Sequence, residues 1–291
     1  MDFHDLAKLA SGHIEARAIQ VAVSLGIFDA LEDKPLDGAT VAAGIGADPR
    51  ATELLLNALA ALALLEKRGK FFTLNDTSSR YLVRSSSQYL GEMILFDASL
   101  WDSWGKLANG VRSGKPVHAA DMYQTDPKET ERFIYAMHSL VQARGDAEIV
   151  AERLDLGNVT DLLDVGSGPG TYTIYFLSKH PKLRATIFDL PGTMKVTEKF
   201  VRTSRVADRI RLVTGDYRVD PIAGTYQMIF LSNIIHAESG DQNALLFAKL
   251  YGCLDHGGKI VVKDHILDES LTHPAVGAVF SLLMLLTTVQ G

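Results

Sequence analysis

The stretch Thr160-Asp-Leu-Leu-Asp-Val-Gly-Ser-Gly-Pro-Gly170 decides the fold of this chain. Its apolar residues predict a short buried strand, after which three glycines recur at alternating positions, Gly166, Gly168 and Gly170. The residues that follow, 172–177, are typical of the start of a helix. Glycine allows a tight turn and lets a ligand approach the main chain, so this strand, turn and helix predict a nucleotide-binding corner.

A carboxylate follows the next predicted strand. Residues 185–188 form a second apolar run that ends in Asp189, about twenty residues after the glycine turn. An acidic residue at this spacing is placed to accept hydrogen bonds from the two hydroxyls of an adenosine ribose. The glycine turn and Asp189 together therefore indicate a site for an adenosine-containing ligand.

Strands and helices alternate from residue 161 onward. We expect strands at 161–165, 185–188, 210–213, 226–231 and 258–263, and helices at 170–179, 192–204, 240–254 and 275–289. This alternation predicts an α/β fold with a doubly wound parallel sheet. Ligands of such sheets bind beyond the carboxyl ends of the strands. We therefore expect one crevice to be lined by the glycine turn and by residues at later strand ends, namely Asp189, Asp216, Tyr217, Ser232 and His236.

The first hundred residues are expected to be mostly helical, with the outline of a winged helix. Thr40 is predicted to cap one helix, and Asp48 is predicted to cap the next, with Pro49 in its first position. Residues 69–74 are expected to form a short strand pair, and further helices are expected between residues 88 and 155. The predicted domains are 1–100, 101–157 and 158–291.

Composition indicates a soluble globular protein. The 291 residues are 47% hydrophobic and 22% charged, with a formal net charge of −6 that disfavours nucleic acid as a partner. The single cysteine, Cys253, fits a reducing compartment. The first residues lack the apolar core of a signal peptide, and the apolar run 275–289 is too short to span a bilayer. We therefore expect a cytoplasmic protein without a membrane partner.

A winged-helix outline also allows a DNA-binding regulator, but the charge speaks against it. Residues 1–100 contain nine Lys and Arg against thirteen Asp and Glu, whereas a DNA-reading module presents a basic face to the phosphates. An apolar module without such a face is better suited to pairing with a second copy. We therefore expect a homodimer formed through residues 1–100.

Several motifs resemble one enzyme family. The chain is similar to class I S-adenosylmethionine-dependent O-methyltransferases of small molecules, the type that includes caffeate, acetylserotonin and bacterial polyketide-tailoring enzymes. The residues that carry this resemblance are Leu163–Gly170, Phe188–Pro191, Gly215–Asp216, Leu231–His236 and Gly257–Asp264, with Leu25–Phe28 and Leu74–Leu82 as markers of the dimerisation domain. The resemblance implies a Rossmann-like methyltransferase sheet, preceded by a mostly helical winged-helix dimerisation domain.

The resemblance also implies S-adenosylmethionine as cofactor and S-adenosylhomocysteine as product. Gly166 and Gly168 would face the amino-acid part of the cofactor, and Asp189 would hold the ribose. Asp216 would accept a hydrogen bond from the adenine amino group, with Tyr217 beside the ring. Arg144 would pair with the cofactor carboxylate. The remaining residues assigned to the cofactor are Asp164, Leu190 and Ser232.

His236 stands where the family has its general base, and Asp264 stands where it has the acid that orients that base. An acceptor hydroxyl must lose its proton as it attacks the methyl group, and a neutral imidazole can take it. Met137, His138 and Asn233 are expected in the acceptor pocket. No metal site is predicted, because the nine histidines are scattered.

Two features depart from the family pattern. Many members follow the histidine with Asp-Trp, whereas this chain has Ala237-Glu238. The sequence ends at Gly291, where the family continues with a helix and a final strand pair. We therefore expect a sheet that lacks its last strands and leaves apolar surface uncovered on the strand 258–263 and on the helix after it.

Two other functions stay open at this point. An NAD-dependent oxidoreductase shares the glycine turn and the acid after the second strand, but it does not account for Gly215-Asp216 or for His236. A methyltransferase-like protein that binds its ligand without turnover accounts for the fold and for the cofactor residues.

Overall fold

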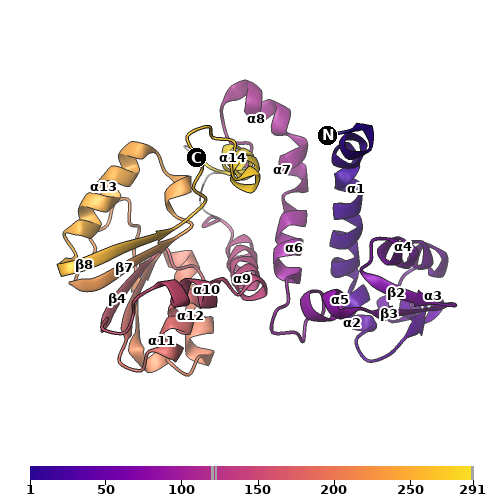
Figure 1. Cartoon of the computed structure of the whole chain (residues 1–291), viewed down its shortest axis with the longest axis horizontal. Helices are drawn as coiled ribbons and strands as arrows, with labels where there is room; N and C mark the ends of the chain where they lie inside the picture. Colours follow the sequence, from indigo (N-terminus) through magenta and orange to yellow (C-terminus); the bar gives the residue numbers. More distant parts are fainter. Residues whose placement is uncertain (119–120, 122, 290–291) are drawn as a thin grey trace. The chain divides into compact units, whose positions relative to one another are not determined.

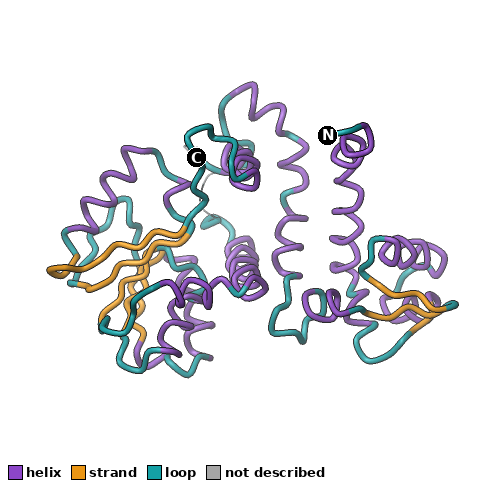
Figure 2. Tube along the Cα trace, viewed as in Figure 1, coloured by secondary structure: helices purple, strands orange, loops and turns teal. Residues whose placement is uncertain are grey.

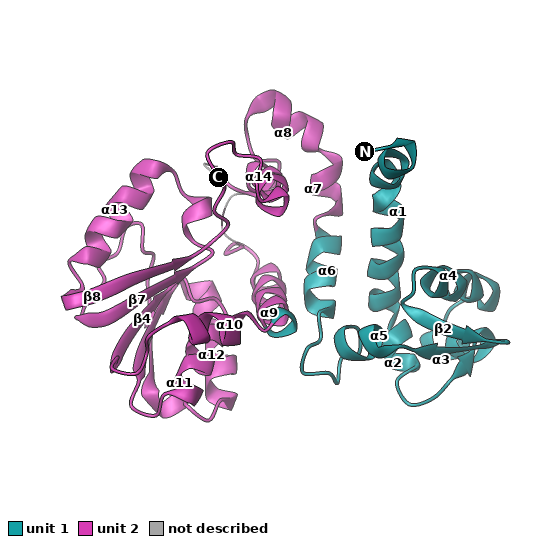
Figure 3. Ribbon diagram, in the orientation of Figure 1, with its two compact units in different colours: residues 1–99, 142–144 teal, residues 100–141, 145–291 magenta. Residues whose placement is uncertain are grey.

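The computed structural model describes residues 1–118, 121 and 123–289 (Figure 1). The chain divides into two compact units (Figure 3). The N-terminal unit contains residues 1–99 and 142–144, and the sheet unit contains residues 100–141 and 145–291. The helical segment expected at 101–157 therefore falls mostly within the unit that contains the large sheet.

The N-terminal unit is a set of helices with a small antiparallel sheet. Its helices are α1 (Phe3–Leu25), α2 (Ile27–Ala30), α3 (Gly38–Ile45), α4 (Pro49–Ala61), α5 (Asp76–Tyr81) and α6 (Gly91–Ser99). Its strands are β1 (Leu36–Asp37), β2 (Leu65–Arg68) and β3 (Phe71–Leu74), in the order β1-β3-β2. Phe28, Leu56 and Phe72 are fully buried in its core. This arrangement of helices followed by a hairpin is the predicted winged-helix outline.

Helix caps in this unit follow local side-chain chemistry. Asp48 caps α4 through a backbone N–H of the first turn, and Pro49 fills the first helical position, as predicted. The prediction that Thr40 caps α3 was wrong. Asp37 is the cap, and its side chain accepts hydrogen bonds from the backbone and the hydroxyl of Thr40, which lies three residues further on.

The strand pair expected within residues 69–74 is longer than predicted. It comprises β2 and β3, and Gly69 lies in the turn between them with φ +60°. A left-handed turn residue is most easily a glycine. The sequence therefore marked the turn of the hairpin correctly but missed its first strand, whose charged residues are mostly exposed.

The sheet unit contains eight α-helices and five strands within its described residues. The helices are α7 (Trp101–Gly105), α8 (Leu107–Ser113), α9 (Pro127–Arg144, whose last residues belong to the N-terminal unit), α10 (Asp146–Arg153), α11 (Thr171–Lys179), α12 (Pro191–Thr203), α13 (Gly240–Tyr251) and α14 (Ala275–Thr287). The strands are β4 (Asp161–Val165), β5 (Arg184–Asp189), β6 (Ile210–Thr214), β7 (Tyr226–Ser232) and β8 (Leu254–Lys263).

The five strands form one parallel sheet in the order β6-β5-β4-β7-β8. Figure 2 shows the strands in orange. Alternate residues of each strand face opposite sides. Leu162 of β4 and Phe230 of β7 pack with α10 and α11 on one side, whereas Leu163 and Leu231 pack with α13 on the other. The predicted α/β class with a doubly wound parallel sheet is confirmed.

Apolar side chains are exposed at the end of the described chain. Val262 on the edge strand β8 is 37% exposed, and Val276 and Val279 on α14 are 63% and 60% exposed. These exposures agree with the expected uncovered surface on the last strand and helix. Among the described residues, no helix combines the length and the apolar character needed to cross a membrane.

Replacing Phe230 should destabilise the sheet unit. Its ring is fully buried and makes edge contacts with the rings of Tyr172 and Phe176, at centroid distances of 5.4 and 5.5 Å. Phe230→Ala removes these contacts and leaves a cavity, so we expect a loss of about 3–5 kcal/mol in the free energy of unfolding, measured by chemical denaturation. Tyr251→Ala, at a 76% exposed position, is the matched control and should change it by less than about 0.5 kcal/mol.

Candidate active site

The turn after β4 has a backbone that requires glycine. Gly166, Gly168 and Gly170 have φ values of +67°, +59° and +75°. A Cβ atom on Gly166 would lie 2.2 Å from the terminal methyl group of Ile234. The N–H of Gly166 donates to the carbonyl of Phe188 at 2.9 Å, so the turn is fixed to the end of β5. The result is a narrow backbone cradle directly before α11, whose first N–H groups receive no side-chain cap.

Asp189 joins the glycine turn to the start of α12. Its carboxylate accepts hydrogen bonds from the backbone N–H groups of Gly168 and of the next residue, Leu190, each at 2.7 Å. The side chain is buried, and burial raises the pKa of Asp189 to about 7 in spite of these hydrogen bonds. A buried acid at this strand end is a strong acceptor for hydroxyl groups of a ligand.

Asp164 stabilises the same turn by hydrogen bonds. Its carboxylate accepts hydrogen bonds from the hydroxyls of Ser167 and Thr173, both at 2.6 Å. Burial raises the pKa of Asp164 to about 6. Thr197 of α12 adds a hydrogen bond to the carbonyl of Gly168 at 2.6 Å. Asp164 therefore acts on the turn through other residues in this structure, and its assignment to the cofactor stays a prediction.

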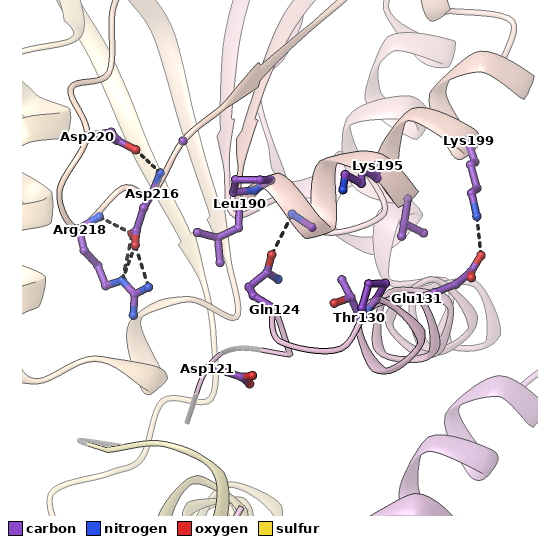
Figure 4. Close-up of a pocket in the computed structure, with 15 residues that line it drawn as sticks. Asp121, Gln124, Thr130, Glu131, Leu190, Lys195, Lys199, Asp216, Arg218 and Asp220 are labelled. Carbon is purple, nitrogen blue, oxygen red and sulfur yellow. Dashed lines mark hydrogen bonds and ion pairs between the residues drawn. The ribbon is translucent and has the colours of Figure 1, made fainter. Parts of the chain in front are cut away.

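Asp216 lies at the end of β6 and is held by Arg218. The guanidinium of Arg218 donates to both carboxylate oxygens of Asp216, with a shortest distance of 2.8 Å (Figure 4). This hydrogen bonding lowers the pKa of Asp216. The pair lines a cleft of about 810 Å³ together with Leu190 and residues of α9 and α12. The sequence did not indicate Arg218, because a basic residue two positions after an acid is ordinary for an exposed loop.

Tyr217 connects two of the predicted segments. Its hydroxyl donates to the carboxylate of Glu238 at 2.8 Å, and burial raises the pKa of Tyr217 above its usual value. Glu238 directly follows the short 3-10 turn Ile235–Ala237, which carries His236. The loop after β6 and the turn after β7 are therefore tied together. Sequence analysis identified Glu238 only as a departure from the family pattern.

His236 and Asp264 form a hydrogen-bonded pair. The Nδ1 atom of His236 lies 2.5 Å from the Asp264 carboxylate, which also accepts the backbone N–H groups of Ile235 and His265. Burial acts to raise the pKa of Asp264, but these hydrogen bonds outweigh it and hold the pKa below its usual value. An anionic partner at Nδ1 selects the tautomer with its proton on Nδ1, which leaves Nε2 as the basic atom.

Two further rings lie close to His236. The ring of Phe280 on α14 lies 5.0 Å from the ring of His236 at an interplanar angle of 88°. His265 stacks on Phe280 at a centroid distance of 4.2 Å. Neither residue was predicted, because their positions depend on how the segment after β8 folds back over the sheet edge.

The structure places the remaining predicted residues around the same sheet edge. Ser232 ends β7, and Asn233 follows with φ +57° and a backbone hydrogen bond to the carbonyl of Lys263 at 2.8 Å. Left-handed asparagine is uncommon and is often found where a chain turns sharply. Both positions adjoin the glycine turn, because β7 pairs with β4.

Helix α9 provides the predicted pocket residues. His138 lies 2.8 Å through Nδ1 from the hydroxyl of Thr171, the first residue of α11, and burial lowers the pKa of His138. Met137 is half-buried beside it. Arg144 lies in the last turn of α9 and belongs to the N-terminal unit, so its pairing with the cofactor carboxylate stays a prediction.

The described residues contain no group of three or more His, Cys, Asp or Glu side chains placed to hold a metal ion.

Comparisons with known proteins identify the family. Residues 104–291 match the O-methyltransferase domain, and residues 7–84 match the O-methyltransferase dimerisation domain. The chain belongs to this family and is an S-adenosylmethionine-dependent O-methyltransferase of small molecules. The oxidoreductase alternative is therefore set aside.

Individual relatives cover nearly the whole chain. It is 29% identical to the tetracenomycin polyketide synthesis 8-O-methyl transferase TcmO of Streptomyces glaucescens, over 99% of this chain and 86% of the relative. It is 30% identical to the acetylserotonin O-methyltransferase of Macaca mulatta, over 97% and 86%. The crystal structure of human N-acetylserotonin methyltransferase in complex with S-adenosylmethionine superimposes with a TM-score of 0.89 at 28% identity, over 99% of this chain and 87% of that chain.

The residues at the sheet edge fit this cofactor. The glycine cradle, which a Cβ atom would fill, suits close approach of its amino-acid part, and the buried carboxylate of Asp189 suits two hydroxyl donors. The cleft beside Leu190 and Asp216 has room for a purine.

The raised pKa of Asp189 should make stability depend on pH. The stabilising contribution of its protonated form is fully present below the unfolded-state pKa of about 4 and is lost as the pH rises through about 7. Asparagine does not titrate. The free energy of unfolding of the wild type should therefore fall relative to Asp189→Asn by about 1–3 kcal/mol between pH 5 and pH 8. Parallel pH profiles of the two proteins in denaturant titrations would contradict this.

Proposed function

We propose that this enzyme methylates a hydroxyl group of a small aromatic acceptor, with His236 as general base. The carrying observation is the hydrogen bond between Nδ1 of His236 and the buried carboxylate of Asp264. Because Nδ1 is taken by this bond, the basic Nε2 atom of His236 is the ring nitrogen that can accept a proton from a bound acceptor. No described residue has a hydrogen bond to this nitrogen that would compete with a substrate.

Each residue has a limited task in this mechanism. When bound, S-adenosylmethionine supplies the methyl group and becomes S-adenosylhomocysteine. Gly166, Gly168 and Asp189 would hold the cofactor, with Asp216 and Tyr217 at its adenine end. Nε2 of His236 would accept the proton of the acceptor hydroxyl, and Asp264 would stabilise the resulting imidazolium. Alignment of the reacting atoms supplies much of the rate enhancement in such displacements.

The surroundings of His236 support a flat aromatic acceptor. Phe280 presents its ring edge-on to the imidazole, and His265 stacks on Phe280. Aromatic faces favour stacked or edge contacts with another ring. The relatives named for 3-hydroxy-5-methyl-1-naphthoate and for acetylserotonin also point to ring-bearing acceptors. Met137, His138 and Asn233 would complete the pocket.

A ligand-binding protein without turnover is the second candidate. The departure at Ala237 favours it, because the family pattern has an acid there. The intact pair of His236 and Asp264 argues for turnover, and we therefore prefer the enzyme.

We infer that the N-terminal unit forms a homodimer. Helix α1 exposes a row of large apolar side chains, Phe3, Leu6, Leu9 and Ile14, with between 56% and 85% of each side chain exposed. Exposed apolar rows of this kind mark interaction surfaces, and residues 7–84 match a dimerisation domain. We further propose a cytoplasmic enzyme whose partners are its acceptor and a second copy, with neither nucleic acid nor membrane involved.

Loss of the imidazole should abolish methyl transfer and spare cofactor binding. In His236→Ala the proton acceptor is gone, so we expect kcat to fall by at least about 100-fold. The assay measures transfer of labelled methyl from S-adenosylmethionine to a panel of phenols and aromatic polyketides. Affinity for S-adenosylhomocysteine by calorimetry should stay near the wild-type value. His256→Ala, at an exposed position of β8, is the matched control. Full activity of His236→Ala would refute the base assignment.

Charges on α1 should separate the two copies. The double variant Leu6→Glu with Leu9→Glu places carboxylates in the proposed interface, where their desolvation opposes association. Light scattering at micromolar concentration should show a dimer for the wild type and a monomer for this variant. Leu245→Glu on α13, at a 64% exposed position, is the control and should remain dimeric. A monomeric wild type would exclude the dimer.

A further inference from the structure

One lysine at the carboxyl end of the sheet has no assigned role. Lys263 is the last residue of β8 and lies in register with Ser232, the last residue of β7. Its ammonium group is 3.4 Å from the side-chain oxygen of Asn233 and 3.7 Å from the carboxylate of Asp146. It also lies 5.8 Å from the centroid of the Tyr172 ring.

These three neighbours belong to segments that lie near the glycine turn. Asn233 directly follows β7, which pairs with the strand that leads into the glycine turn. Tyr172 is the second residue of α11, which begins immediately after Gly170. Asp146 begins α10, which packs against α11 through Ala147. Lys263 therefore reaches the sheet edge from the neighbouring strand, on the side where α11 starts.

The contacts of Lys263 leave donor capacity for an anion. An ammonium group has three N–H donors. Its distances to Asn233 and Asp146 are both longer than the 2.7–2.9 Å of a strong charge-assisted hydrogen bond. The side chain is only 29% exposed, so water compensates its charge incompletely. A carboxylate arriving from the glycine turn would complete this coordination.

We propose that Lys263 binds the α-carboxylate of S-adenosylmethionine. The inference rests on the proposed function, in which Gly166 and Gly168 face the amino-acid end of the cofactor. That end carries a negatively charged carboxylate. Lys263 supplies a cation from the end of β8, whereas β7 ends in the uncharged Ser232 and is followed by the uncharged Asn233. Asn233 would then act as a positioning residue, because its side-chain oxygen accepts from the ammonium group.

A pair of ligands separates carboxylate recognition from general folding. S-adenosylhomocysteine carries the amino-acid end, whereas 5′-methylthioadenosine has the same adenosine and thioether without it. Calorimetry on the full chain should show that Lys263→Met weakens S-adenosylhomocysteine binding by about 10- to 100-fold, the effect expected for one charge-assisted hydrogen bond. Binding of 5′-methylthioadenosine should not change, which also reports that the variant is folded. Lys263→Arg should recover part of the loss.

Two further variants sharpen the test. Lys259→Met removes a lysine from the same strand and the same strand face, at an exposed position four residues earlier, and should bind both ligands like the wild type. Arg144→Met tests the other cation predicted to meet the carboxylate. If Lys263→Met keeps the wild-type preference for S-adenosylhomocysteine, the assignment of Lys263 is overturned. A wild type that binds neither ligand would overturn the cofactor placement itself, and the Lys263 assignment with it.

Discussion

Parallel pairing of the five strands is the constraint on which the whole site depends. Because all five run in the same direction, their carboxyl ends meet at one edge, and the register then decides which residues become neighbours. Val165 lies beside Phe188 and Leu231, so the glycine turn, Asp189 and the turn that carries His236 begin at the same level of the sheet. A slip of one residue in any pair would send that strand's side chains to the opposite face. The apolar residues on both faces of β4 and β7 therefore fix the active site as well as the core.

The glycine turn itself depends on buried carboxylates. Asp164 and Asp189 are both almost fully buried, which is costly for ionised groups, and each is compensated by hydrogen bonds to the turn or its flanks. Their raised pKa values follow from the same burial. The carboxylates hold the backbone in conformations that only glycine adopts easily, and Asp189 keeps an acceptor at the strand end. In the proposed function, Asp189 therefore serves both the structure of the turn and the binding of the cofactor.

The sequence predicted the strand ends well and the contacts between them poorly. Strand periodicity and glycine spacing are local signals, so the sequence alone predicts Gly166, Asp189 and His236 at the ends of their strands. The partners Arg218, Glu238 and Lys263 could not, because each acts through a side chain whose direction is set by tertiary packing. Glu238 meets Tyr217 across 21 positions, and Lys263 meets Asn233 across 30. The misassigned cap of α3 has the same origin on a small scale, since Asp37 and Thr40 are both good cap residues and only the backbone decides between them.

At Ala237-Glu238, where the chain departs from the family pattern, other side chains provide a carboxylate contact and an aromatic ring. In place of the acid and the aromatic residue of the Asp-Trp pair, this chain has Ala237 and Glu238. In the structure, Glu238 uses its carboxylate to hold the hydroxyl of Tyr217, and the ring beside His236 comes from Phe280 on α14. The surroundings of His236 are thus built from the turn after β7, the end of β8 and helix α14, which exposes apolar side chains on its outer face. In the proposed site, β4, β5, β6 and β7 and their turns hold the adenosine part of the cofactor, and β8 adds only Lys263 for its carboxylate. Turnover should therefore be lost before cofactor binding when the edge of the sheet is disturbed, because the two functions are supported by parts of the fold with different packing.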